Sequence, residues 1–149
     1  MSIRSTAVQW LKKVHGVNSG IVCTSKFYIP EKSRTKKSAW WIEIDRSKLV
    51  TTSTQVLHFV CEKEPGQRDF HYLQLPGSYL IKNQKELDVR SNNRYSMFLS
   101  AEQGNLFQDE RGKGKVTFSQ FLIWTEIIIN QPEVHLRYSK RGIWSKTGK

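Results

Sequence analysis

Alternation of apolar and polar residues with a period of two constrains the fold of this chain more than any other feature of its sequence. In Trp40–Asp45, the side chains of Trp40, Ile42 and Ile44 alternate with those of Trp41, Glu43 and Asp45. Such a period places successive side chains on opposite faces of a β-strand. The same alternation, rich in β-branched and aromatic residues, recurs at Ile21–Ile29, Leu57–Cys61, Phe70–Leu75 and Tyr95–Leu99. We therefore expect several strands, with Trp40 facing a core and Trp41 facing away from it.

Helical spacing is clearest at the N-terminus. Apolar residues recur there at Ile3, Ala7, Trp10, Leu11 and Val14. Ser2 can cap the start of this helix and Gly16 can end it. A short helix is expected after Pro76, carrying Leu80 and Leu87. A last helix is expected within residues 118–129, capped by Thr117 or Ser119 and stopped by Pro132, and it is apolar nearly all round.

These elements predict an α+β fold. Residues 1–136 would form a single domain, with a four- to six-stranded, largely antiparallel sheet flanked by an N-terminal helix, a short middle helix and a C-terminal apolar helix. Residues 137–149 would form a basic, flexible tail, and a strand at Val134–Tyr138 is the alternative for its start. A chain of 149 residues can bury such a core without disulfides or metals. Cys23 and Cys61 have apolar neighbours and are expected to be reduced core residues. With no signal-peptide-like start and no long apolar run, the sequence favours a soluble, cytoplasmic protein.

The positive charge is unevenly distributed along the chain. Residues 1–42 carry eight Lys or Arg against one acid, residues 43–110 carry eight against ten, and residues 111–149 carry eight against two. The formal net charge is +11. Segregated like charges repel one another, and a polyanionic partner would offset this cost.

Three basic segments are candidates for contacting such a partner. The first contains Lys32, Arg34, Lys36 and Lys37 and precedes Trp41, which could stack on a nucleobase. The second contains Arg111, Lys113 and Lys115, with glycines between them that allow backbone N–H groups to converge on an anion. The third is the tail, where Arg137, Lys140 and Arg141 are interleaved with Tyr138 and Trp144. The alternatives are a solvated hairpin loop, a flexible turn and a frayed terminus.

Two pairs of carboxylates are candidate metal ligands. Glu43 and Asp45 share one face of their expected strand, and Glu62 and Glu64 follow another strand with Lys63 between them. The expected order of helix, strands, helix and strand over residues 2–99 is similar to the core of the PD-(D/E)XK nucleases. That resemblance implies carboxylates and a lysine that bind magnesium and activate water. The acid-x-Lys signature of that family is absent here, because Lys63 follows Glu62 directly and residue 64 is Glu.

Three hypotheses follow from the sequence. The leading one is a small, basic, cytoplasmic protein that binds DNA or RNA with low sequence specificity and needs no cofactor. The second is a Mg²⁺-dependent nuclease with a degenerate motif. The third is an interaction subunit whose apolar helix at 118–129 docks onto a protein partner.

Overall fold

Two β-sheets packed face to face form the body of this protein in the computed structural model, which describes residues 2–50, 55–123, 136–138 and 144–146. The four-stranded sheet, called sheet A here, has the order β1-β3-β4-β7, in which β1 is parallel to β3 and the other pairs are antiparallel. The three-stranded sheet, sheet B, has the order β2-β6-β5 and is antiparallel throughout. The strands of the two sheets are β1 (Ile21–Ser25), β2 (Ala39–Asp45), β3 (Val56–Glu62), β4 (Phe70–Pro76), β5 (Asp88–Val89), β6 (Arg94–Ser100) and β7 (Leu122–Ile123).

The α+β class is thus confirmed, whereas the expectation of one sheet is wrong. Both sheets turn their apolar faces inward, and Trp40 of β2 shows how closely they meet. Its indole N–H donates to the carbonyl of Glu62 on β3 at 2.7 Å, and its ring stacks on Phe107 with centroids 4.9 Å apart. The alternation that predicted the strands assigns their faces correctly. It does not say which strands share a sheet.

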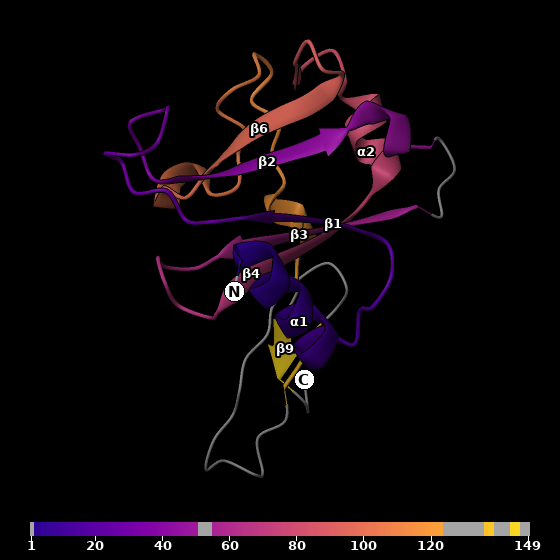
Figure 1. The fold of residues 1–149 in the computed structure, drawn as a ribbon, viewed down its shortest axis with the longest axis vertical. Coiled ribbons are helices and arrows are strands. Elements are labelled where there is room, and N and C mark those ends of the chain that lie inside the picture. The colour runs from indigo at the N-terminus through magenta and orange to yellow at the C-terminus, as the bar shows by residue number, and fades with distance from the viewer. Residues whose placement is uncertain (1, 51–54, 124–135, 139–143, 147–149) are drawn as a thin grey trace.

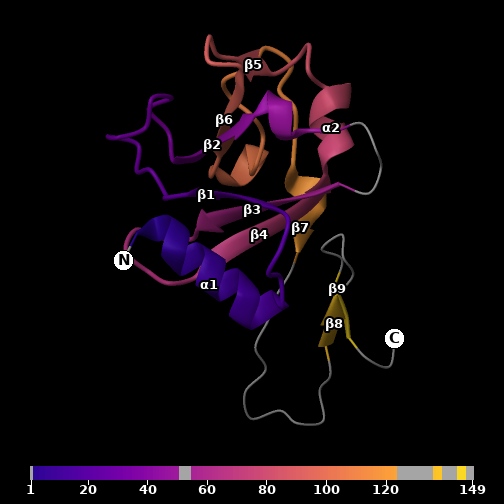
Figure 2. The same cartoon turned by 45° about the vertical axis from the view of Figure 1, so that its right-hand side comes forward.

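Helix α1 (Ile3–His15) covers the other face of sheet A, as Figure 2 shows. Ser2 caps it by accepting the Ser5 N–H at 3.1 Å, and Gly16 ends it in the left-handed region with φ 71°, both as predicted. Ala7 and Leu11 are buried against Val60 and Tyr72 in a second, smaller core. Among the described residues, no helix has the length and apolar character needed to cross a bilayer.

Short elements connect the two sheets. Helix α2 (Gly77–Lys82) follows Pro76 and carries Leu80, as predicted, but it ends at Lys82, so the placement of Leu87 on this helix is wrong. Three 3₁₀ turns complete this part of the chain: η1 (Arg46–Lys48), η2 (Gln103–Asn105) and η3 (Ser119–Phe121).

The predicted C-terminal helix is wrong where the structure describes it. Residues 119–121 form the turn η3, and Leu122 and Ile123 form strand β7, which pairs with Leu73 and Tyr72 of β4. An apolar run satisfies a strand as well as a helix, and the free edge of β4 provides the hydrogen-bond partners for a strand. Residues 124–129 of the predicted helix lie outside the described residues.

The region predicted as a flexible tail contains paired strands. β8 (Leu136–Tyr138) and β9 (Trp144–Lys146) pair antiparallel, with Arg137 opposite Ser145. The alternative of a strand at Val134–Tyr138 agrees with the structure over Leu136–Tyr138, and residues 134–135 lie outside the described residues. Both cysteines are free and buried, which also agrees with the prediction.

Candidate nucleic-acid interface

The outer face of sheet B carries a short row of aromatic side chains. Trp41 and Phe98 are cross-strand partners on β2 and β6, with ring centroids 6.0 Å apart and a tilt of 63°. The indole N–H of Trp41 donates to the hydroxyl of Ser96 at 2.9 Å, which fixes the orientation of the ring. Trp41 and Phe98 are both half-buried and belong to neither hydrophobic core. The face of sheet B that points away from the core therefore presents two aromatic rings held in defined positions.

The loop of residues 30–38 lies beside this aromatic pair and is held at both ends. Tyr28 and Ala39 exchange backbone hydrogen bonds of 2.9 and 3.1 Å, and the Ser38 N–H donates to Glu102 at 3.1 Å. The Ser33 side chain is buried and its hydroxyl contacts that of Thr35 at 2.9 Å. The four predicted cations of the loop are exposed: Lys32, Arg34, Lys36 and Lys37.

A hollow of about 120 Å³ joins this loop to the aromatic pair. Its lining includes Lys32 and Arg34 from the loop together with Tyr28, Trp41 and Phe98. The structure thus brings two cations of the first predicted basic segment, Lys32 and Arg34, to the predicted stacking residue, whereas Lys36 and Lys37 do not line the hollow. Phe98 and Tyr28 were not singled out from the sequence, although Phe98 is two residues from a polar Ser96 and so has the parity of an outward-facing residue.

Arg111 extends the same row from the second basic segment. Its guanidinium lies 4.9 Å from the centroid of Phe98, and it forms an ion pair with Asp88. Lys115 lies 3.6 Å from Glu110, and Lys113 is exposed. Two of the three cations in this segment therefore already have an acidic neighbour.

The backbone N–H groups of the glycine-rich segment have an acceptor inside the protein. The fully buried Asp109 carboxylate accepts N–H groups from Phe98, Arg111 and Gly112 at 3.0 to 3.1 Å. Burial raises the pKa of Asp109, and these three donors act in the opposite direction. The Gly114 N–H donates to the carbonyl of Glu86. The expectation that these glycines point N–H groups at an external anion is therefore wrong.

Glycine is needed here for close backbone approach. A Cβ on Gly112 would lie 2.3 Å from the Glu86 carbonyl oxygen.

The third basic segment is only partly described. Arg137 and Tyr138 lie on β8 and Trp144 lies on β9. Lys140 and Arg141 lie outside the described residues.

Three of the four carboxylates that suggested a metal site have partners within the protein, and the fourth, Glu64, is exposed. Glu43 forms an ion pair with Arg90 at 3.1 Å. Asp45 accepts the backbone N–H and the hydroxyl of Ser47, and these bonds lower its pKa. Glu62 is buried and accepts the N–H groups of Phe27 and Gly66 at 2.9 and 3.1 Å. In the part of the chain that the structure describes, no group of three or more His, Cys, Asp or Glu residues is arranged to hold a metal ion.

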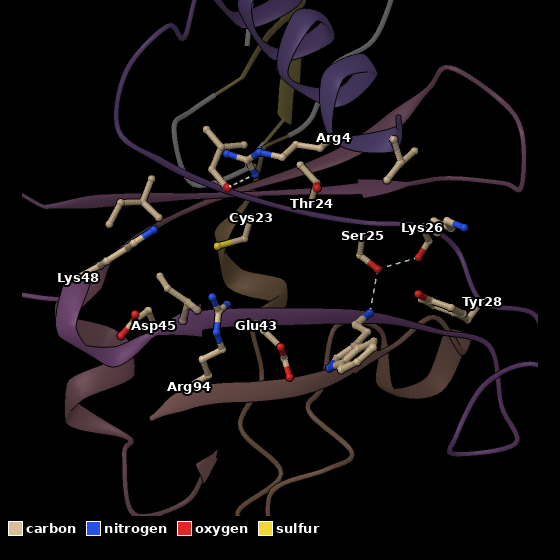
Figure 3. A pocket seen from close by; sticks show the side chains of 15 residues that line it. Arg4, Cys23, Thr24, Ser25, Lys26, Tyr28, Glu43, Asp45, Lys48 and Arg94 are labelled. Atoms are coloured by element: carbon tan, nitrogen blue, oxygen red, sulfur yellow. Dashed lines mark hydrogen bonds between the residues drawn. The ribbon is translucent and has the colours of Figure 1, made fainter. Parts of the chain in front are cut away.

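A second concave surface was missed by the sequence reasoning. A cleft of about 560 Å³ lies between β1 and β2, the edge strands of the two sheets, and is drawn in Figure 3. Four cations line it: Arg4, Lys26, Lys48 and Arg94. They are isolated in the sequence and come from different elements, so no local charge run marks them.

In comparisons with protein-family models, curated proteins and solved structures, nothing matches this chain. The interface is therefore interpreted from its own chemistry.

Proposed function

We propose that this protein binds nucleic acid with low sequence specificity and with a preference for single strands. The observation that carries the proposal is the junction of Trp41 and Phe98 with Lys32 and Arg34 around one hollow. Proteins that bind single strands without sequence readout combine aromatic stacking platforms with cations that follow the phosphate backbone.

The aromatic geometry favours unstacked bases as the ligand. The Ser96 hydroxyl holds the Trp41 indole by its N–H, so the ring can accept a base without losing much rotational freedom. Bases inside a duplex are already stacked and hide their faces, whereas bases in single strands and loops can stack on a protein ring. The half-buried Phe98 ring, tilted against Trp41, supports the platform from the neighbouring strand.

The charge around the platform suits a phosphate backbone. Lys32 and Arg34 are exposed, so contact with phosphates would require little desolvation or rearrangement. Arg111 beside Phe98 adds a cation to the same face, although its ion pair with Asp88 reduces its strength as a phosphate ligand. None of these groups points to a particular base, so the expected specificity is low.

A salt titration with matched variants tests the proposal. The double variant Lys32→Gln/Arg34→Gln should lower the slope of log affinity against log salt by about 0.7 for each phosphate that the protein no longer neutralises. The control is Lys12→Gln/Lys13→Gln, which removes the same charge from exposed positions on α1 and should change the slope much less.

The aromatic part of the site is tested separately. Trp41→Leu should weaken single-strand binding by about 5- to 150-fold, which corresponds to roughly 1–3 kcal/mol of stacking, with an unchanged salt slope. Trp41→Phe loses the bond to Ser96 but keeps a ring, and it should retain most of the affinity. Affinity that hardly changes between about 50 and 200 mM salt would refute the proposal.

A further inference from the structure

The cleft between β1 and β2 is open at one end and closed at the other. At the closed end, the Ser25 hydroxyl accepts the Trp41 backbone N–H at 2.8 Å, and Tyr28 pairs with Ala39. Beyond Ser25 the two edge strands separate, and Figure 3 shows the side chains of Cys23, Lys48 and Arg94 in the space between them. The cleft is therefore bounded on both sides by sheet edges.

Three cations from three elements converge on this space. Arg4 comes from α1, Lys48 from η1 and Arg94 from β6. All three cations are close enough to the buried Cys23 thiol to affect its pKa. Burial raises the pKa of Cys23 to about 12, and the charges of Arg4, Lys48 and Arg94 each act to lower it. Figure 3 shows their charged groups on different sides of the Cys23 side chain. Three positive charges around one cavity repel one another, and an anion between them would relieve that repulsion.

The cations of the cleft have few partners within the described residues. Neither the Lys48 ammonium nor the Arg94 guanidinium forms an ion pair or a hydrogen bond there. Arg4 donates one N–H to the carbonyl of Val22 at 2.8 Å, which aims its guanidinium over the edge of β1. The acids of the cleft are Glu43, which is paired with Arg90, and Asp45, which lies opposite Arg94 in the β2–β6 register. The two bonds from Ser47 lower the pKa of Asp45, and the charges of Arg94 and Lys48 lower it further, so Asp45 offsets part of the positive charge of the cleft.

The cleft is continuous with the proposed stacking platform. Trp41 lines both the cleft and the hollow next to Lys32 and Arg34. Lys26 and Tyr28 also line a third concavity, of about 500 Å³, which includes Lys32 and Arg68. The residues at the closed end of the cleft therefore also line the two concavities beside the 30–38 loop.

From this arrangement we infer that the β1–β2 cleft is a channel for the phosphate backbone of one nucleic-acid strand, with Arg4, Lys48 and Arg94 as phosphate ligands. This inference rests on the proposed function and names the part of the ligand that the platform does not hold. The volume is that of a small-ligand site, which suits a short stretch of single strand, whereas a duplex presents two backbones around a stack of paired bases.

The test compares the triple variant Arg4→Gln/Lys48→Gln/Arg94→Gln, and each single variant, with the wild type on a single-stranded oligonucleotide. Each single substitution should lower the salt slope by about 0.7, and the triple variant should lower it by about 2. The matched control is Lys12→Gln/Lys13→Gln combined with Lys85→Gln, which removes the same charge from exposed positions outside the cleft. Thermal unfolding of every variant identifies any loss of fold.

A second measurement uses inorganic tripolyphosphate in place of nucleic acid. It should raise the melting temperature of the wild type and of the control, and it should not raise that of the triple variant. The melting temperature of each protein is compared with and without tripolyphosphate. The shift therefore remains informative even if the triple variant is less stable than the wild type.

The outcomes separate this inference from the proposed function. One outcome would overturn this inference alone: the wild type binds with a steep salt dependence, Lys32→Gln/Arg34→Gln lowers the slope, and the triple variant behaves like its control. In that case the cleft is not the channel, and the proposed function stands. If the wild type shows no salt-dependent binding, both fall. A triple variant that loses affinity equally for a hairpin duplex and a single strand would also overturn the single-strand channel.

Discussion

Replacing Asp109 should show how strongly its carboxylate holds the 107–112 segment in place. Its two oxygens accept three backbone N–H groups: Oδ1 takes those of Phe98 and Arg111, and Oδ2 takes that of Gly112. In Asp109→Asn, the amide oxygen can keep the first two, while the amide nitrogen faces the Gly112 N–H and leaves it without an acceptor. In Asp109→Ala, all three N–H groups are left without their acceptor.

The magnitude follows from the number of N–H groups left unsatisfied. Each buried donor without an acceptor costs about 1–3 kcal/mol. Both variants remove the same buried charge, so the gain from removing that charge cancels when they are compared with each other. Asp109→Ala should therefore be less stable than Asp109→Asn by about 2 kcal/mol or more.

Urea unfolding at neutral pH, followed by tryptophan fluorescence, measures this difference. The exposed Asp69, which pairs with Lys63 at the protein surface, supplies the control, and Asp69→Ala should cost less than about 1 kcal/mol. If Asp109→Asn and Asp109→Ala unfold within about 0.5 kcal/mol of each other, the role given to these hydrogen bonds is refuted.

Two further predictions concern other buried groups. Burial lowers the pKa of His71 to about 4, below its ordinary value of 6.5, so the unfolded state binds a proton more readily than the folded state. The free energy of unfolding should therefore fall as the pH drops from about 6.5 to about 4, by at most about 3 kcal/mol. The difference in unfolding free energy between wild type and His71→Gln, followed by urea unfolding across that range, should show this slope, and a constant difference would contradict it. Burial also raises the pKa of both Cys23 and Cys61, so a thiol reagent at pH 8 should react slowly with the native protein and rapidly after unfolding in urea. Rapid native labelling of either thiol would contradict this protection by burial.

Local patterns in the sequence predicted the local structure well. The caps of α1 at Ser2 and Gly16 and the inward orientation of Trp40 follow from residue type and spacing alone. These features depend on neighbours within a few residues, and such information is present in one sequence. The burial of both cysteines follows for the same reason.

Features that depend on distant partners were not predictable in this way. Leu122 and Ile123 became a strand because β4 has an edge to pair with, and the run of apolar residues around them fits a helix equally well. Asp109 lies just outside the basic segment 111–115, and nothing in the spacing shows that its carboxylate would take the N–H groups of that segment. The cleft cations are separated by tens of residues and meet only because two sheet edges lie side by side.

Several acidic side chains in the nearly neutral middle of the sequence form ion pairs or hydrogen bonds within the protein, which changes how the charge of that block is interpreted. Glu43, Asp88 and Glu110 neutralise arginines or a lysine beside them, while the buried carboxylates of Glu62 and Asp109 are bonded to backbone N–H groups. Of the two acids that line the cleft, Glu43 is paired with Arg90, whereas Asp45 lies beside Arg94 and Lys48 and offsets part of their charge. The middle block also contributes Lys48 and Arg94 to that cleft, where they join Arg4 from the N-terminal block. A nearly neutral block of the sequence thus contributes to a local positive surplus in space, because four cations and two acids line the space between the two sheet edges. A ligand that relieves this repulsion would bind more weakly as salt screens it, which is why the salt slope of the cleft variants is a more direct test than affinity alone.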